Sequence, residues 1–335
     1  MNAVLIGFGY WGPNIARNLN ASKDFTLYGI CDSDPKKLDK ARAIYGDSVK
    51  YAADYNQFLD DASVDMCAVA LRDEIAQKAA RSVLQSKKHL FMEKPIATKL
   101  DDALLLQKMA RENDVKIHVD HILIYNPYIR RIKEIVDAGE LGELLYFDSA
   151  RANLGPHIKN DMNAMWDLAV HDLAILDYLC GGKEARFVSC VGVKKYSSQE
   201  ALTYLSIQYD GFVAMLKSSW ISPLKQRLMI IGGTNKMVVF DDLRESEKLM
   251  IYDKGFDLSG HLFEEYGQYE AKVRTGDLFV PYIEQEDALL NGINHFADCI
   301  LKDKESLSGP EQAIRVLRIL EKADKSLAQN QEESE

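Results

Sequence analysis

The segment "AVLIGFGYWGPNIARNL", residues 3–19, contains an apolar run, a glycine-rich turn and the start of a helix-like stretch. The apolar residues 3–6 indicate a short strand. Gly7, Gly9 and Gly12 then fit the pattern G-x-G-x-x-G. In this pattern the first glycine permits a tight turn, the second lets the backbone approach a pyrophosphate, and the third allows close packing of helix on strand. This order of strand, turn and helix predicts a dinucleotide-binding fold at the N-terminus.

A carboxylate lies where the adenosine ribose of a dinucleotide would bind. Asp32 follows the predicted strand 25–31 and comes twenty residues after Gly12. A carboxylate there accepts hydrogen bonds from ribose hydroxyls and repels a 2′-phosphate, which favours NAD over NADP. Lys36 and Lys37 keep NADP open as the less favoured cofactor. The residues predicted to contact the cofactor are Gly7, Phe8, Gly9, Tyr10, Trp11, Gly12, Asp32, Leu71, Glu93 and Lys94.

The pattern of strands and helices changes near residue 120. Before it, apolar strands such as 64–71 and 89–92 alternate with helical segments, which predicts a parallel sheet with crossover helices. Between 185 and 252, several β-rich runs follow one another and indicate antiparallel strands. The predicted fold class is α/β, with an N-terminal Rossmann domain and a C-terminal α+β domain built on a large, mostly antiparallel open sheet. The predicted boundaries are 1–120 and 121–328, with a disordered tail at 329–335.

Composition and cysteine content argue against several classes of protein. The 335 residues are 47% hydrophobic and 27% charged, as in a globular protein long enough for two domains. A net charge of −10 argues against a nucleic-acid binder, because binding phosphates needs a basic face. The five cysteines form no CxxC pair, so neither a disulfide framework nor a zinc site is expected. No apolar run approaches the roughly 18 residues of a membrane helix, so we expect no membrane contact. Reduced cysteines fit a cytoplasmic protein. We further expect a small-molecule substrate, no metal and no nucleic acid.

Two further stretches carry residue types that hydride transfer from an alcohol requires, namely a base for the hydroxyl proton and a cation for the developing alkoxide. In "FMEKPIA", residues 91–97, Glu93 and Lys94 follow an apolar strand at its carboxyl end. Ligands bind at this end of the strands in open α/β sheets. Lys94 is predicted to approach the substrate oxygen, and Glu93 to hold Lys94 or the nicotinamide side of the site. A surface Glu-Lys pair is the alternative interpretation.

The second stretch is "WDLAVHD", residues 166–172. Asp167 and His171 are four residues apart and therefore share one face of the predicted helix. A nearby carboxylate favours the protonated form of a histidine and fixes its orientation. The pattern suits a histidine base with an aspartate partner, although a histidine with a structural role is the alternative. Asp172 is predicted to pair or cap nearby, and Trp166 to be a core or wall residue.

The motifs "GFGYWG", "EKP" and D-x-x-x-H together resemble those of the Gfo/Idh/MocA family of nicotinamide-dependent oxidoreductases. The resemblance covers nearly the whole chain. It implies a catalytic lysine at Lys94, a catalytic pair at Asp167 and His171, and a second domain whose open sheet mediates dimers or tetramers. One stretch departs from the family pattern, because Leu71-Arg72-Asp73 stands where many members carry Thr-Pro followed by His.

Several stretches, among them "HILIYNP" and "ELGELLYFDSARANLG", are similar to members that act on nucleotide sugars in the biosynthesis of surface polysaccharides. This similarity implies a UDP-linked amino sugar or its uronate as substrate. Other readings stay open: a free polyol such as inositol, a monosaccharide, a keto-sugar that is reduced, an NAD-dependent glycosidase, or a non-catalytic NAD-binding regulatory protein. Arg151 is the candidate for a carboxylate or phosphate. The residues predicted to line the substrate site are Tyr125, Asn126, Arg151 and Asn153.

Overall fold

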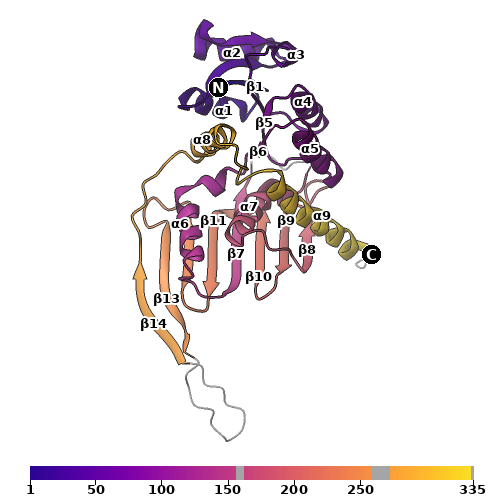
Figure 1. The fold of residues 1–335 in the computed structure, drawn as a ribbon. Helices are drawn as coiled ribbons and strands as arrows, with labels where there is room; N and C mark the ends of the chain where they lie inside the picture. Colours follow the sequence, from indigo (N-terminus) through magenta and orange to yellow (C-terminus); the bar gives the residue numbers. More distant parts are fainter. Residues whose placement is uncertain (156–161, 258–271, 333–335) are drawn as a thin grey trace, which may run out of the picture. The chain divides into compact units, whose positions relative to one another are not determined.

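The chain folds into two compact units. The first contains Met1–Asn126 and Glu286–Arg318, and the second contains Pro127–Gln285 and Ile319–Glu335. The sequence-based boundary at residue 120 lies close to this division, but the prediction assigned all of 286–318 to the second domain. The computed structural model describes residues 1–155, 162–257 and 272–332 (Figure 1).

Six parallel strands form the sheet of the first unit, in the order β3-β2-β1-β4-β5-β6. This is the strand order of doubly wound dinucleotide-binding folds, so the predicted Rossmann fold is confirmed. The strands are β1 (Asn2–Ile6), β2 (Thr26–Cys31), β3 (Lys50–Ala52), β4 (Met66–Val69), β5 (His89–Met92) and β6 (Ile117–Val119). The helical segments are α1 (Gly12–Ala21), α2 (Pro35–Tyr45), η1 (Gly46–Ser48), α3 (Asn56–Leu59), α4 (Asp73–Gln85), α5 (Leu100–Glu112), η2 (Ile122–Tyr125) and α8 (Ala288–Leu301).

Helix α8 explains why residues 286–318 belong to the first unit. Its Leu289, Ile293 and Phe296 are buried in the same core cluster as Ile15 and Leu19 of α1. Burial of these side chains removes apolar surface from water, and the partners lie more than 250 residues apart in the sequence. The chain therefore returns to the first sheet after completing the second, which no local pattern reveals.

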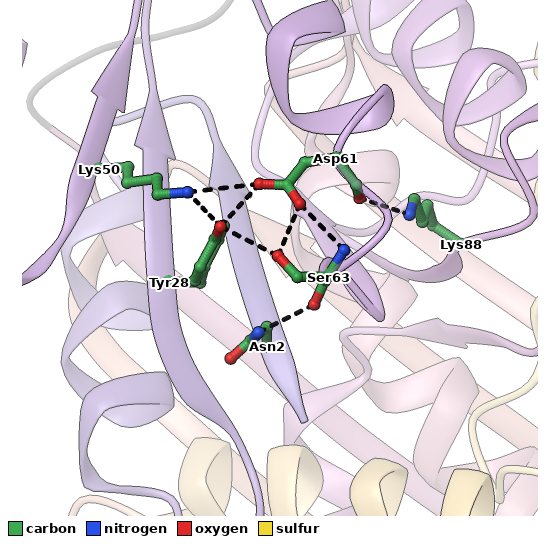
Figure 2. A network of polar contacts seen from close by, with 6 residues as sticks. All are labelled: Asn2, Tyr28, Lys50, Asp61, Ser63 and Lys88. Carbon is green, nitrogen blue, oxygen red and sulfur yellow. Dashed lines mark hydrogen bonds and ion pairs between the residues drawn. The ribbon is translucent and has the colours of Figure 1, made fainter.

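A polar network joins the amino ends of the strands in the first unit (Figure 2). Tyr28 Oη and Ser63 Oγ each donate a hydrogen bond of 2.6 Å to the carboxylate of Asp61. Lys50 contacts both Tyr28 and Asp61, and Lys88 Nζ donates to the Asp61 carbonyl oxygen at 2.8 Å. Hydrogen bonds from Ser63 first, and then from Tyr28, hold the pKa of Asp61 below its usual range. The network fixes the loop before β4 at the edge opposite the carboxyl ends of the strands.

Eight strands form the sheet of the second unit, in the order β14-β13-β12-β11-β7-β10-β9-β8. Within the described strands, β7 and β10 pair in parallel and the other neighbours pair antiparallel, as predicted for a mostly antiparallel sheet. The strands are β7 (Leu144–Leu154), β8 (Phe187–Val193), β9 (Leu202–Gln208), β10 (Val213–Ser219), β11 (Ile221–Gly233), β12 (Met237–Asp241), β13 (Leu249–Asp257) and β14 (Lys272–Phe279). The helical segments are α6 (Pro127–Asp137), the π-helical turn η3 (Met165–Ala169), α7 (Val170–Leu179) and α9 (Pro310–Glu332), whose first part belongs to the first unit.

The two faces of this sheet differ in exposure. On β9, Thr203, Leu205 and Ile207 are buried. Tyr204, which lies between Thr203 and Leu205, is exposed. This alternation continues across the neighbouring strands, because side chains opposite one another in register share a face. We call the exposed side the open face; its apolar side chains are Phe187, Val191, Val193, Tyr204, Val213 and Met215.

The C-terminal helix extends further than predicted. Helix α9 reaches Glu332, so residues 329–332 are helical rather than part of a disordered tail. Asn330 Nδ2 donates to the carbonyl oxygen of Cys190 at 2.9 Å, which anchors this end of the helix to β8. Residues 333–335 of the predicted tail lie outside the described residues. Among the described helices, none has the combination of length and apolar character that would allow it to cross a membrane.

The packing of α8 predicts the effect of truncating Phe296. The side chain is fully buried, so Phe296→Ala should lower the free energy of unfolding by about 3–5 kcal/mol through lost burial and a residual cavity. Leu301 lies on the same helix with 61% of its surface exposed, and Leu301→Ala should change stability by less than about 0.5 kcal/mol. Urea unfolding of both variants measures the difference. Equal small effects would contradict the assignment of α8 to the core of the first unit.

Candidate active site

The glycine turn between β1 and α1 has the backbone that the sequence pattern predicts. Gly7 has a φ of +103°, and a Cβ added there would lie 2.6 Å from the carbonyl oxygen of Ala70. A Cβ added at Gly12 would lie 2.2 Å from the carbonyl oxygen of Gly7. At Gly9, in contrast, an added Cβ would have no heavy atom of the described residues within 4 Å, apart from its two chain neighbours. The fold therefore requires glycine at 7 and 12, whereas Gly9 leaves space beside the backbone that suits an approaching pyrophosphate.

Asp32 connects the end of β2 to this turn. Its buried carboxylate accepts hydrogen bonds from the backbone N–H groups of Phe8 (2.8 Å) and Asp34 (2.9 Å). Lys37 Nζ lies 3.4 Å from the same carboxylate. Asp32 is thus held against the glycine turn, where the ribose-binding prediction requires it. Lys37 offsets part of the negative charge that was expected to repel a 2′-phosphate.

The other residues predicted to contact the cofactor lie in different environments. The Phe8 side chain is buried, so only its backbone is available to a ligand. Tyr10 is 90% exposed. Leu71 borders the turn, since its Cδ2 atom would lie 2.9 Å from a Cβ at Gly7. Trp11 is partly buried, and its Nε1 donates to Asp120 Oδ2 at 3.2 Å.

The Trp11 contact leads to a pair of acids at the carboxyl ends of β5 and β6. The carboxyl groups of Glu93 and Asp120 lie close enough to affect each other's pKa, and a hydrogen bond between them would require a proton on one of the two. Burial, and then the neighbouring Asp120, raise the pKa of Glu93 well above its usual range. Burial also raises the pKa of Asp120, to about 6. Sequence analysis did not single out Asp120, although an acid directly after the apolar strand at 117–119 was a signal for it.

Lys94 lies close enough to this pair for their charges to interact. Its ammonium group lowers the pKa of Glu93 and of Asp120, although burial raises both by more. His121 is fully buried, and neither ring nitrogen has a hydrogen-bond partner within the described part of the chain. Burial, and then Lys94, lower the pKa of His121 to about 3, so this imidazole stays neutral. The peptide bond between Lys94 and Pro95 is cis.

The predicted pair Asp167 and His171 lies in the second unit, at a change of helix type. Asp167 belongs to the π-helical turn η3, and His171 follows in the first turn of α7. Such π-helical turns occur frequently at functional sites. Trp220 Nε1 donates to Asp167 Oδ2 at 3.1 Å and so orients this carboxylate. Trp166 donates instead to Asp324 Oδ2 at 2.7 Å, as expected of a structural residue.

In this structure the Arg151 guanidinium is paired with a carboxylate, and its contact with a substrate stays a prediction. Its Nη2 lies 2.6 Å from Asp172 Oδ1, and its Nε lies within 3.3 Å of both Asp172 oxygens. Both side chains are largely buried, with 12% and 4% of their surfaces exposed. Asp172 pairs nearby, as predicted, and the partner it takes is Arg151. Asn153 Oδ1 accepts a hydrogen bond from Arg227 Nη2 at 3.2 Å, so it positions Arg227.

Tyr125 is unavailable to a substrate, which corrects its predicted role. Its side chain has no exposed surface, and its hydroxyl lies 3.0 Å from Ser308 Oγ. Its ring stacks on His118, with 5.5 Å between the centroids. Tyr125 is therefore a core residue of the first unit. Asn126, the next residue, is partly buried at the end of η2, and its substrate role stays a prediction.

Comparison with known proteins identifies the family. Residues 1–121 match the family described as "Oxidoreductase family, NAD-binding Rossmann fold" (GFO_IDH_MocA), and residues 129–239 match "GFO/IDH/MocA C-terminal domain". The chain belongs to the Gfo/Idh/MocA family. The predicted family, the prediction of an oxidoreductase and the NAD-binding Rossmann fold are therefore confirmed, while the roles of the site residues other than Tyr125 remain predictions.

Relatives from this family share modest identity over nearly the whole chain. The scyllo-inositol 2-dehydrogenase (NAD(+)) of Bacillus subtilis strain 168 is 22% identical over 318 residues, covering 91% of this chain and 87% of the relative. The myo-inositol 2-dehydrogenase of Thermotoga maritima is 22% identical and covers 92% of this chain and 98% of the relative. The UDP-N-acetylglucosamine 3-dehydrogenase GnnA from Acidithiobacillus ferrooxidans superposes with a TM-score of 0.82 at 22% identity, covering 98% of this chain and 97% of that one. This likeness shows the shared fold.

The glycine turn predicts a separation of cofactor binding from stability. Gly9→Ala places its methyl group in open space, so the thermal unfolding temperature should stay unchanged, whereas the affinity for NADH should fall by about tenfold or more. Fluorescence titration with NADH and thermal unfolding measure the two quantities.

Gly12→Ala is the matched control for this variant. Its methyl group would meet the Gly7 carbonyl oxygen, so this substitution should lower the unfolding temperature as well as the affinity. If Gly9→Ala bound NADH as tightly as the unchanged protein, the pyrophosphate could not lie beside Gly9.

Proposed function

We propose that this protein is an NAD(H)-dependent dehydrogenase that transfers a hydride between the nicotinamide and a ring hydroxyl, or the corresponding ketone, of a sugar. The preferred substrate is a nucleotide-linked amino sugar or its uronate, and the pathway is the biosynthesis of surface polysaccharides. The observation that carries the proposal is Lys94, placed beside the acid pair at the carboxyl ends of β5 and β6. Membership of the oxidoreductase family supports the reaction type.

In the proposed reaction the chain supplies a cation, a base and an orienting carboxylate. NAD, when bound at the glycine turn, supplies the hydride acceptor. The Lys94 ammonium stabilises the negative charge that develops on the substrate oxygen. His171 takes the hydroxyl proton, and Asp167, oriented by Trp220, favours the protonated imidazole that results. Because the pKa values of Glu93 and Asp120 are both raised, a proton on this pair would leave less negative charge beside Lys94 than two ionised acids would.

Two substrate classes receive support from different relatives. The fold of UDP-N-acetylglucosamine 3-dehydrogenase covers nearly the whole chain, which supports a nucleotide sugar. The inositol dehydrogenases match the chain at the sequence level over more than nine tenths of its length, which supports a free polyol as the second candidate. We place the nucleotide sugar first, and a direct assay distinguishes the two.

We propose NAD rather than NADP as the cofactor. Asp32, held against the glycine turn by the Phe8 N–H, supports this choice because its carboxylate would repel a 2′-phosphate. Lys37, at 3.4 Å from Asp32, weakens that repulsion without removing it. The cofactor preference is therefore expected to favour NAD while leaving measurable turnover with NADP.

We also propose that the protein is a cytoplasmic homo-dimer or homo-tetramer that associates through the open face and binds neither nucleic acid nor membranes. The six apolar side chains of the open face are between 39% and 62% exposed, and they lie on three neighbouring strands, as expected of a surface that contacts another protein. A second copy of the same sheet would cover it. All five cysteines are free, which fits a reducing compartment.

Turnover with purified protein tests the proposed reaction. We expect NADH absorbance to rise when NAD is mixed with UDP-N-acetylglucosamine or its uronate, and to rise less with myo-inositol, glucose or NADP. Lys94→Ala should lower kcat/KM by roughly 10²–10³-fold, because it removes one charge from the developing alkoxide, and should leave NADH affinity nearly unchanged.

Lys99→Ala is the control, since Lys99 is exposed in the same unit and should tolerate the change. Turnover by Lys94→Ala at the original rate would exclude Lys94 from catalysis. Faster turnover of inositol than of either nucleotide sugar would replace the first substrate class with the second.

The oligomer is tested on β10, which contributes Val213 and Met215 to the open face. Replacing Val213 and Met215 by glutamate should convert the dimer or tetramer to a smaller species, because burying unpaired carboxylates is costly. Leu301→Glu, at an exposed apolar residue of the first unit, should leave the assembly unchanged. Light scattering gives the molar mass of each variant. A monomeric unchanged protein, or a double variant with unaltered mass, would contradict association through this face.

A further inference from the structure

Arg227 lies beside the candidate substrate residues of the second unit, although the sequence did not single it out. It belongs to β11 and pairs in register with Arg151 of β7. Residues directly opposite each other on antiparallel strands project from the same face of a sheet. Arg227 therefore shares the face from which Arg151 reaches Asp172 of α7, next to the D-x-x-x-H segment.

The two arginines differ in how their charges are balanced. Arg151 is neutralised by the two-pronged ion pair with Asp172. Arg227 instead donates from Nη1 to the carbonyl oxygens of Ala152 (3.0 Å) and Gln226 (2.7 Å), and from Nη2 to Asn153 Oδ1 (3.2 Å). All three acceptors are neutral. Within the described residues, no carboxylate lies at ion-pair distance from Arg227, and its Nε makes no hydrogen bond.

The surroundings of Arg227 leave its positive charge only partly compensated. The side chain is partly buried. Burial, and then the positive charge of Arg151, lower the pKa of Arg227, and the more distant acids Asp172, Asp242 and Asp167 offset only part of this effect. An anion bound to the guanidinium would relieve this imbalance, because a partly desolvated charge interacts strongly with an opposite one.

A purely structural role accounts for only part of this arrangement. The register between β7 and β11 shifts between Ile221 and Gln226, and the Nη1 hydrogen bonds of Arg227 bridge the two strands just past that shift. Neutral donors would satisfy those carbonyl oxygens equally well, at a lower desolvation cost than a guanidinium. The Arg227 guanidinium is held by three neutral acceptors, and its Nε makes no hydrogen bond within the described residues. This planar, charged group is instead suited to binding an oxyanion.

We propose that Arg227, positioned by Asn153, binds an anionic group of the substrate, either a carboxylate or a phosphoryl group. This inference rests on the proposed function and narrows it, because it makes a negatively charged sugar derivative the preferred substrate over a neutral polyol. Arg151 then acts indirectly: its pairing with Asp172 keeps that carboxylate from neutralising Arg227.

Equilibrium binding tests the inference without requiring turnover. Isothermal titration calorimetry of the protein with saturating NADH would compare D-glucuronate, uridine diphosphate, glucose and myo-inositol. Arg227→Gln should weaken binding of at least one anionic probe by about tenfold or more and leave the neutral probes unchanged. Arg186→Gln is the matched control, because Arg186 is an exposed arginine of the same unit, paired with Asp210, and its replacement should change no affinity.

The two anionic probes distinguish the source of the negative charge. Loss of glucuronate affinity alone assigns a carboxylate to Arg227, and loss of uridine diphosphate affinity alone assigns a phosphoryl group. Arg227→Lys keeps the charge but loses the planar fork, so it should restore phosphoryl binding better than carboxylate binding. Thermal unfolding of this variant and of Arg227→Gln separates a lost ligand contact from a disturbed sheet.

The inference is overturned if the unchanged protein binds neither anionic probe more tightly than its neutral counterparts. It is also overturned if Arg227→Gln weakens anionic and neutral probes equally, or weakens neither. Absence of hydride transfer with every sugar, alongside Arg227-dependent anion binding, would instead count against the proposed reaction and leave the anion site intact.

Discussion

The first unit depends on the close contact between α1 and β1, where the Gly12 backbone meets the Gly7 carbonyl oxygen. An added Cβ at Gly12 would approach this oxygen to 2.2 Å, so only glycine lets the helix begin at this distance from the strand. The contact fixes the turn whose Phe8 N–H donates to Asp32 and whose Trp11 donates to Asp120. One steric constraint therefore orders the ends of β1, β2 and β6 together.

The acids beside Lys94 show how burial changes the pKa of a side chain and therefore the charge that it carries. Two ionised carboxylates close together and away from water would repel each other strongly, so burial and mutual repulsion raise the pKa of Glu93, and burial raises that of Asp120. His121, which follows Asp120 in the sequence, remains neutral because burial, and then the charge of Lys94, disfavour its protonated form. Lys94 thus lies among groups that carry less charge than their sequence suggests, which leaves its ammonium group better able to stabilise a developing alkoxide.

Local sequence patterns predicted the structural features that depend on neighbouring residues. They missed the features that depend on residues far apart in the sequence. The glycine turn, the parallel strands and the antiparallel sheet follow from spacing and alternation within short segments. The burial of Tyr125 depends on Ser308, which lies 183 residues away, and the placement of residues 286–318 depends on the α1 face that α8 covers. Sequence analysis did not single out Asp120, because its role arises from contact with Trp11, which lies 109 residues earlier.

The arginines of the second unit show why residue type alone does not identify a binding charge. Arg151 and Arg227 occupy opposed positions on neighbouring strands, and sequence analysis favoured the first. The folded chain neutralises Arg151 with Asp172 and surrounds Arg227 with neutral oxygens. An ion pair formed inside the protein has already exchanged its hydration for a partner, so it gains little from a ligand. The charge available for recognition is therefore the one that the fold orients but does not neutralise.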